Sequence, residues 1–296
     1  MTQSALIVGS GNIAKKHEKS LRLISNKIKI KKIKSRKFQS FLNQSPEELQ
    51  FNLIIICSPS SEHYRHINLI ERNFTKIKVL IEKPLFNKLI TLKKKLKNQY
   101  FVGYNLRFHP IIQFIKKYLE KKKILSINVI CTSYLPKWRK GKDYKKSVSA
   151  QKRFGGGVLL ELSHEIDYLN WIFKNFKILN SYNKKISNLK INVDDILNFT
   201  AEKNKKTILN LSINFFSISE RRKIFIDGEN FSIDADLITN KLKVFEKKKL
   251  KLITYKKFKK IDTYKNQNLS LIKDKFKNLC SIKEGLKVLK IISKIK

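Results

Sequence analysis

The first 105 residues alternate between short apolar stretches and longer stretches in which apolar residues recur with helical spacing. The stretches SALIV (4–8), LIII (53–56) and KVLI (78–81) are almost wholly apolar, which is typical of strands buried on both faces. Helical segments separate them along the chain. This alternation of strands and helices predicts an α/β domain built on a doubly wound parallel sheet.

The pattern changes in the second part of the chain. A helical segment at 110–122 precedes several long stretches in which apolar and polar residues alternate, as in KTILNLSINFF (206–216). Alternation with a period of two predicts an open, mostly antiparallel sheet. An amphipathic helix is expected at 281–294. We therefore expect an N-terminal domain and a C-terminal α+β domain, over residues 1–105 and 106–296.

The composition narrows the classes of protein. The net charge is +42, but only nine of the 65 basic residues are arginines and the lysines are spread along the whole chain. Readers of nucleic acid rely on arginine, so we expect drift in composition and no specific nucleic-acid partner. The three cysteines form no disulfide or metal pattern. No apolar run approaches the length of a membrane span, and a cytoplasmic protein without a metal is expected.

Glycine is scarce, with nine residues in the chain, so its positions are informative. Gly9 and Gly11 lie in VGSGNIA, directly after the strand at 4–8 and before a helix. Such a loop brings the backbone close to a pyrophosphate, which the helix N-terminus at Asn12 and Ile13 would bind. The pattern predicts a Rossmann domain that binds a dinucleotide. The alternative is a tight turn in an unrelated α/β domain.

The end of the second strand discriminates between the two nicotinamide cofactors. An acid there binds the 2′-hydroxyl of NAD, whereas basic and hydroxyl residues accept the 2′-phosphate of NADP. This chain has Ser35, Arg36 and Lys37 at that position and no acid beside them. We therefore expect NADP(H) to be favoured over NAD(H).

Two further motifs carry candidate chemistry. Lys83 lies in EKP at the carboxyl end of a strand, where a lysine can polarise a carbonyl or stabilise an alkoxide; the alternative is a surface lysine before a turn. Three glycines at 155–157 lead into a helix on which Glu161, His164 and Asp167 follow at i, i+3 and i+6. A histidine beside a carboxylate suits proton transfer near neutral pH. The alternative is a histidine that lines an inert pocket.

Together, VGSGNIAKKH, CSPSSEHYRH, VLIEKPL, GYNLRFHP and GGGVLLELSHEIDYLNWIF resemble the glucose–fructose oxidoreductase / inositol dehydrogenase (Gfo/Idh/MocA) family. The resemblance is closest to members in surface-polysaccharide and sialic-acid-like sugar pathways. It implies an NAD(P)-dependent oxidoreductase acting on a CH–OH group, with Lys83 and His164 at the substrate carbon and a Lys83–Pro84 peptide that is often cis. The resemblance and the motifs together give these expected cofactor contacts: Gly9, Gly11, Asn12, Ile13, Ser35, Arg36, Lys37, Cys57, Ser58, Pro59, His63, Glu82 and Lys83.

The resemblance also implies a homodimer or homotetramer formed through the C-terminal sheet. One departure is that the first acid of the family's D-x-G-x-H-x-x-D pattern is a glutamate, Glu161, one residue closer to His164. Either Glu161 or Asp167 is therefore expected to orient His164. A non-catalytic protein that binds dinucleotide and sugar is the alternative function. The candidate substrate contacts, for a phosphorylated, nucleotide-linked or acidic sugar, are Arg107, His109, Trp138, Arg139, Lys142, Tyr144 and His164.

Overall fold

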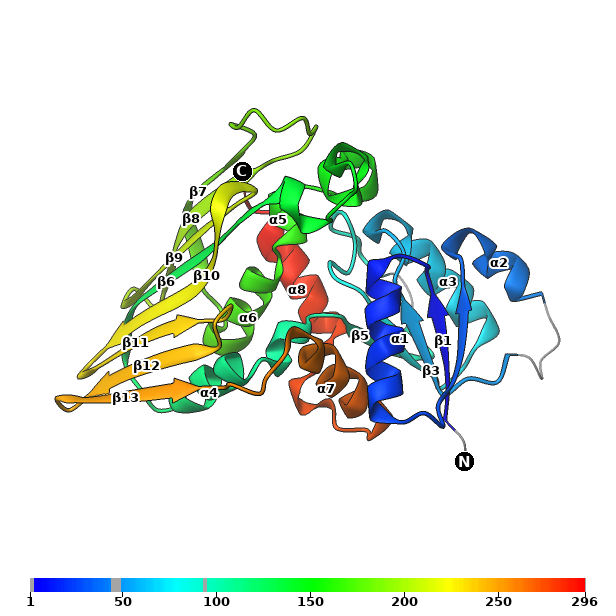
Figure 1. The fold of residues 1–296 in the computed structure, drawn as a ribbon, viewed down its shortest axis with the longest axis horizontal. Coiled ribbons are helices and arrows are strands. Elements are labelled where there is room, and N and C mark those ends of the chain that lie inside the picture. The colour runs from blue at the N-terminus through cyan, green and yellow to red at the C-terminus, as the bar shows by residue number, and fades with distance from the viewer. Residues whose placement is uncertain (1–2, 44–48, 93–94, 296) are drawn as a thin grey trace. The chain divides into compact units, whose positions relative to one another are not determined.

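The computed structural model describes residues 3–43, 49–92 and 95–295. The chain forms two compact units (Figure 1). The first consists of Met1–Phe108 and Lys259–Leu289, and the second of His109–Phe258 and Lys290–Lys296. The second segment of the first unit differs from the expected division, which placed everything after residue 105 in the C-terminal domain.

A six-stranded sheet forms the centre of the first unit, in the order β14-β5-β4-β3-β1-β2. The first five strands along the chain pair in parallel, and only β14 is antiparallel to its neighbour β5. The apolar residues of the central strands are buried, as expected for a parallel sheet covered by helices. The strands are β1 (Ser4–Val8), β2 (Lys29–Ile33), β3 (Leu53–Ile56), β4 (Lys78–Ile81), β5 (Gln99–Val102) and β14 (Cys280–Ser281).

The strand order reverses between β1 and β3, because the chain moves from β1 to β2 on one side and then returns to β3 on the other. Ligands of doubly wound sheets bind at such a switch point, beyond the carboxyl ends of the strands. The helices of this unit are α1 (Asn12–Ile24), α2 (Phe38–Phe41), α3 (His63–Asn73), α7 (Lys260–Ile272) and most of α8 (Ile282–Ile292).

The C-terminal part of the chain is integrated into this unit by buried polar contacts. The guanidinium of Arg107 bonds to Glu284 Oε1 at 2.9 Å, and Asn105 Nδ2 donates to Thr263 Oγ1 at 2.6 Å. Helix α7 packs against α1, where Asn268 Nδ2 donates to His17 Nδ1. The sequence places these partners more than 150 residues apart, so local patterns gave no sign that the chain returns to the first unit.

An eight-stranded sheet dominates the second unit, in the order β13-β12-β11-β10-β6-β9-β8-β7. All neighbours are antiparallel except β6 and β9, so the expected mostly antiparallel sheet is confirmed. The strands are β6 (Ile124–Tyr134), β7 (Lys177–Lys184), β8 (Ile196–Lys203), β9 (Thr207–Asn214), β10 (Phe216–Gly228), β11 (Phe231–Asp236), β12 (Lys241–Glu246) and β13 (Lys249–Thr254).

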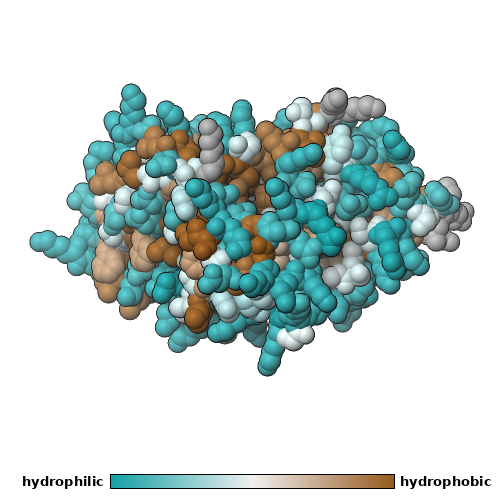
Figure 2. All heavy atoms as spheres, turned by 90° about the horizontal axis from the view of Figure 1, so that it is seen from above, coloured by the Kyte–Doolittle hydropathy of each residue, from teal (hydrophilic) through white to brown (hydrophobic). Residues whose placement is uncertain are grey.

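Residues of this sheet alternate between a buried and an exposed face. On β12, Leu242 and Val244 are buried, whereas Phe245 is 43% exposed and lies opposite Leu250 of β13, which is 53% exposed. Figure 2 shows hydrophobic residues, in brown, interrupting the mostly hydrophilic surface on the face that it presents. Three helices complete the unit: α4 (Pro110–Tyr118), shorter than the expected 110–122, α5 (Val158–Glu161) and α6 (His164–Phe173).

Candidate functional site

The glycine loop of the first unit has the geometry that a dinucleotide requires. Gly9 has a φ of +138°, and a Cβ there would lie 2.8 Å from the Cys57 carbonyl oxygen, so only glycine fits. A Cβ at Gly11, in contrast, would meet no described atom within 4 Å. Gly11 directly precedes α1, so the N-terminus of a 13-residue helix is open to an approaching phosphate. These residues fit the pyrophosphate of NAD or NADP.

The first residues of α1 complete the VGSGNIA segment, in which Ala14 takes the third position after Gly9 and Gly11. Asn12 is exposed and Ile13 half-buried at the open end of the helix, while Ala14 is fully buried against the sheet. A small residue at this third position lets the helix lie close to the strand.

The residues predicted to select the cofactor form a short 3-10 turn, Ser35–Lys37, just after β2. Arg36 and Lys37 are exposed. The Ser35 hydroxyl lies 3.4 Å from Nε2 of His66 on α3. His66 was not among the predicted site residues, and its other ring nitrogen lies 2.9 Å from Ser58 Oγ. This buried histidine therefore connects the ends of β2 and β3.

The loop after β3 lies beside the glycine loop, because the Cys57 N–H donates to the Val8 carbonyl at 2.8 Å. His63 was expected to line the cofactor. The structure places its ring in the interior, fully buried, with one nitrogen 3.0 Å from the Leu85 carbonyl oxygen and the other 3.0 Å from that of Ser58. Burial lowers the pKa of His63. Its contacts join the loop after β3 to the turn after β4, which is a positioning role.

Glu82, Lys83 and Pro84 follow β4. The Glu82 carboxylate is buried, and its Oε1 lies 2.8 Å from His17 Nε2. Because Asn268 Nδ2 donates to His17 Nδ1, the His17 Nε2–H donates to Glu82. The second carboxylate oxygen accepts from the Lys83 N–H at 3.2 Å. Glu82 thus fixes the backbone of the half-buried Lys83, and the Lys83–Pro84 peptide is cis, as the resemblance implied.

The three consecutive glycines of the second unit are required by contacts within the protein. A Cβ at Gly156 would lie 2.5 Å from the Val148 carbonyl oxygen. At Gly157, where φ is +108°, it would lie 2.2 Å from Asp194 Oδ1. Asp194 in turn accepts from the Val158 and Leu159 N–H groups at the start of α5. The glycines therefore allow a sharp bend that is fixed by two neighbouring segments.

The expected single helix after the glycines is wrong. The chain forms α5, turns at Leu162 and Ser163, and begins α6 at His164. Glu161 is therefore on a different helix from His164 and Asp167, and helical spacing no longer places it on their side. His164 is half-buried at the first position of α6, and Asp167 follows one turn later, 1% exposed. Leu162, Ile166, Leu169 and Phe173 are buried.

The ion pair beneath α6 was not predicted from the sequence. Glu165 is fully buried and receives two bonds from Arg222 of β10, at 2.8 Å from Nε and 3.2 Å from Nη2. The two bonds fix the rotation of α6 on the sheet. In the sequence, Glu165 is visible only as the neighbour of His164. Its partner, Arg222, lies 57 residues further along the chain.

Three of the expected substrate contacts, Arg107, Trp138 and Tyr144, form hydrogen bonds within the protein. Arg107 is fully buried and bonds to Glu284 and to the Leu279 carbonyl, so its role is structural and the expected substrate contact is corrected. Trp138 donates to Ser133 Oγ at 3.0 Å and packs edge-on against Phe215. Tyr144 is half-buried, and its hydroxyl accepts from the Lys190 N–H at 3.0 Å.

The remaining candidate substrate contacts are Arg139, Lys142 and His109. Arg139 is half-buried and Lys142 exposed in the same segment. His109 is buried; it precedes α4, and its Nδ1 accepts from the Ile111 N–H at 3.3 Å. Among the described residues, no group of three or more histidine, cysteine, aspartate or glutamate side chains could hold a metal ion. No helix within the described ranges is long and apolar enough to cross a membrane.

Solved structures resemble the chain over its whole length. A levoglucosan dehydrogenase in complex with NADH has a TM-score of 0.81 at 15% identity, covering 100% of this chain and 96% of its own. The UDP-N-acetylglucosamine 3-dehydrogenase GnnA from Acidithiobacillus ferrooxidans has a TM-score of 0.77 at 14% identity, covering 100% and 97%. The WlbA dehydrogenase from Bordetella pertussis, in complex with NADH and UDP-GlcNAcA, has a TM-score of 0.77 at 15% identity, covering 100% and 95%. At these identities the likeness shows the fold.

The switch-point loops and the two-part fold define a Rossmann-type protein of the dehydrogenase class. No curated protein sequence matches the chain. The model of the Gfo/Idh/MocA oxidoreductase family, described as having an NAD-binding Rossmann fold, matches residues 4–104. The match includes the glycine loop and the EKP motif, so the resemblance predicted from the motifs is confirmed.

Proposed function

We propose that the protein is an NAD(P)-dependent oxidoreductase that acts on a CH–OH group of a sugar derivative. The observation that carries the proposal is the glycine loop at the switch point, where Gly11 leaves the N-terminus of α1 open to a pyrophosphate. The family match over residues 4–104 supports it. So does the similarity to dehydrogenases described with NADH and with sugars or UDP-sugars.

The residues divide the chemistry between them. The bound nicotinamide accepts or supplies the hydride. Lys83, whose backbone is fixed by Glu82, stabilises the charge on the substrate oxygen. His164 carries the proton that must leave or reach that oxygen. Asp167, one helical turn along α6, orients the His164 ring; because Glu161 belongs to α5, we favour Asp167 for this role.

NADP(H) is the proposed preferred cofactor. Arg36 and Lys37 are exposed at the end of β2, where a 2′-phosphate would lie, and Ser35 adds a hydroxyl donor. Titration with NADPH and with NADH gives the preference directly from the two dissociation constants.

The test of the catalytic proposal compares Lys83→Ala and His164→Ala with the unchanged protein. Oxidation of NADPH or NADH is followed with a panel of keto-sugars, and reduction of NADP or NAD with the matching alcohols. We expect turnover to fall by about two to four orders of magnitude in each variant, while the NAD(P)H affinity of His164→Ala changes by less than about threefold. Turnover like that of the unchanged protein in both variants would remove these assignments.

A non-catalytic binding protein is the second candidate. The helix break between Glu161 and His164 favours it, because the two residues do not share the single helix on which their spacing as an acid–histidine series was based. Binding of cofactor and sugar without any turnover in the unchanged protein would support this candidate.

We also propose that the exposed face of the large sheet joins subunits in a homodimer or homotetramer. The cross-strand pair Phe245 and Leu250, both about half exposed, gives this face the apolar character of an interface. Light scattering gives the mass, and a monomer would contradict the proposal.

A further inference from the structure

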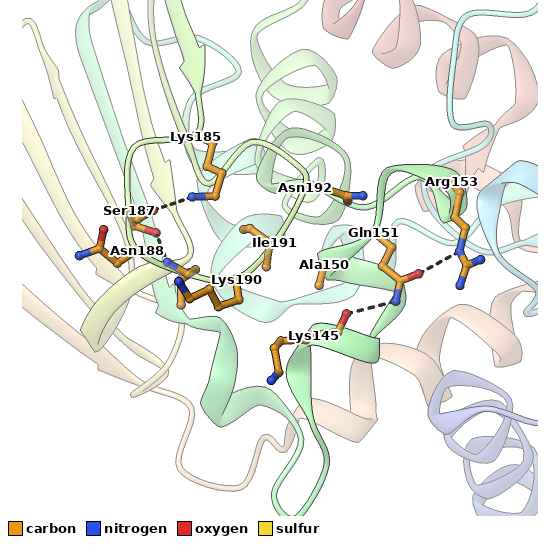
Figure 3. A pocket seen from close by; sticks show the side chains of 11 residues that line it. Lys145, Ala150, Gln151, Arg153, Lys185, Ser187, Asn188, Lys190, Ile191 and Asn192 are labelled. Carbon is orange, nitrogen blue, oxygen red and sulfur yellow. Dashed lines mark hydrogen bonds between the residues drawn. The ribbon is translucent and has the colours of Figure 1, made fainter.

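A cavity of about 780 Å³ lies within the second unit (Figure 3). One wall is the segment that contains Lys145, Ala150, Gln151 and Arg153, and the other is the loop 185–192 between β7 and β8. The cavity is largely open to solvent, its four basic side chains are exposed, and its volume is in the range of pockets that bind small molecules. Apart from Tyr144 beside it, no residue of this cavity was expected from the sequence to contact substrate.

Hydrogen bonds hold the two walls together. The Lys190 N–H donates to the Tyr144 hydroxyl at 3.0 Å, and the Lys152 N–H donates to Asn192 Oδ1 at 2.9 Å. The Asn192 N–H donates to the Ala150 carbonyl at 3.3 Å. Because these bonds cross from one segment to the other, the cavity has a defined shape.

The loop wall is also anchored from behind. Asp195 is fully buried, and its carboxylate accepts from the Ile186 and Ser187 N–H groups at 2.8 and 3.0 Å, and from the Ser187 hydroxyl at 2.5 Å. Two backbone donors and one hydroxyl satisfy this carboxylate internally. Its negative charge is thus used to fix the loop and is not presented to the cavity.

The cavity is connected to the proposed catalytic helix through the triple-glycine bend. The Gly156 N–H donates to the Gln151 carbonyl at 3.1 Å, and the Gly157 N–H donates to the Ser149 carbonyl at 3.1 Å. On the other side, Asp194 binds the first N–H groups of α5. The first wall is therefore bonded directly to the bend that leads to α5 and α6, and Asp194, which binds the start of α5, follows the loop of the second wall two residues after Asn192.

The lining of the cavity combines positive charge with an apolar part. Among the described residues that line it, none is acidic, and four are basic: Lys145, Arg153, Lys185 and Lys190. Gln151 contributes an amide that donates to the Lys145 carbonyl and accepts from Arg153 Nε. Ala150, Leu189 and Ile191 supply the apolar surface. Basic side chains form charge-assisted hydrogen bonds with a phosphate group, whereas a neutral sugar offers no charge for them to bind.

We propose that this cavity binds the phosphate-bearing part of the substrate. The substrate is accordingly a phosphate-linked sugar, with the apolar lining in contact with the group that the phosphate carries, and the reacting carbon toward His164. This inference rests on the proposed oxidoreductase function and narrows its substrate class. It separates the chain from enzymes of the same fold that act on an uncharged sugar, such as the levoglucosan dehydrogenase.

The test uses UDP as the probe and isothermal titration calorimetry as the measurement. The variant Lys145→Gln/Lys190→Gln removes two charges from opposite walls of the cavity. The matched control, Lys205→Gln/Lys206→Gln, removes two exposed charges from the turn between β8 and β9, at the end of β8 remote from the loop 185–192. The control is essential because a chain with a net charge of +42 attracts any anion.

We expect UDP to bind the unchanged protein and the control within about twofold of each other, and the cavity variant to bind about tenfold more weakly. Equal weakening in both variants would show general attraction between charges and overturn the proposal, as would failure of UDP and inorganic phosphate to bind at all. Competition by inorganic phosphate distinguishes the two sources: displacement of UDP at similar concentrations indicates a sugar phosphate, and weak displacement indicates a nucleotide-linked sugar.

Two further measurements separate failure of this inference from failure of the proposed function. NADPH affinity should be unchanged in the cavity variant, because Gly9 and Gly11 belong to the other unit. If the unchanged protein oxidises or reduces an uncharged sugar and its KM is unaffected by Lys145→Gln/Lys190→Gln, the oxidoreductase function stands and the phosphate site is rejected.

Discussion

The two units organise their candidate sites in different ways. At the switch point of the first unit, Gly9 and Gly11 shape the loop before α1, and the buried side chains of His17, His63 and Glu82 hold the surrounding loops. In the second unit, ionised side chains perform both tasks: Glu165 and Arg222 hold α6, and basic residues line the cavity. Recognition by the backbone depends on shape, and recognition by side chains depends on charge.

The difference affects what each unit tolerates. A site that depends on shape loses its function when a side chain is added to a glycine. A site that depends on charge loses its function or its stability when one member of an ion pair is removed. The three predictions below test this contrast, beginning with the largest expected effect.

Arg222→Ala should be the most destabilising change. It leaves the fully buried Glu165 carboxylate without its two bonds from the guanidinium, and breaking a buried pair in this way costs about 3–5 kcal/mol. Urea unfolding followed by circular dichroism measures the loss. The neighbouring Arg221 on the same strand is exposed, so Arg221→Ala is the control and should change stability by less than about 0.5 kcal/mol. Equal effects of the two substitutions would contradict an ionic anchor beneath α6.

Gly9→Ala and Gly11→Ala form a matched pair in the first unit. At Gly9 the added methyl would meet the Cys57 backbone at 2.8 Å in a conformation with φ of +138°, so we expect a loss of about 2–4 kcal/mol in stability. At Gly11 the methyl meets no described atom within 4 Å, and stability should change by less than about 1 kcal/mol.

Gly11→Ala also tests cofactor binding separately from folding. Gly11→Ala places its methyl group where the pyrophosphate approaches the start of α1, so NADPH affinity should fall by at least about tenfold in a protein that remains folded. Calorimetric titration measures the affinity. Unchanged NADPH binding by Gly11→Ala would contradict the position assigned to the phosphates.

The contrast also explains how much the sequence could predict. The parallel sheet was predictable because the strands LIII and KVLI are apolar throughout, and the dinucleotide loop was predictable because glycines are scarce in this chain. A site that recognises its ligand by backbone geometry leaves this kind of trace. A lysine-lined cavity leaves none when basic residues are abundant everywhere, and Lys145 or Lys190 is indistinguishable in the sequence from Lys205.

Other features depend on contacts that the sequence does not bring together. His17 meets Glu82 and Asn268, and Arg107 meets Glu284, only because the C-terminal segment packs into the first unit. Helical periodicity likewise continued through Leu162 and Ser163, where the structure has a turn. Periodicity reports which residues are buried, and Leu162 is buried in either conformation, so it could not reveal the break that separates Glu161 from His164.

The smallest predicted effect is a dependence of stability on pH, to which His66 contributes in the first unit and His109 in the second. Burial lowers the pKa of His66 in the first unit to about 4, with the nearby His63 and Arg65 acting in the same direction. Burial also lowers the pKa of His109 in the second unit to about 4. Both values lie below the usual 6.5, so the unfolded chain binds the proton first and the folded protein loses stability as the pH falls from about 6.5 toward 4.

Between pH 7 and pH 5.5 each of these histidines should account for about 1 kcal/mol of lost stability. Urea unfolding at the two pH values, on the unchanged protein and on His66→Gln and His109→Gln, measures the contribution of each. Each glutamine variant should lose less stability than the unchanged protein over this interval, whatever its stability at pH 7, because a neutral side chain has no proton to gain. If His66→Gln alone reduces the loss, the pH sensitivity belongs to the first unit. If neither variant reduces it, these histidines are not the groups that titrate.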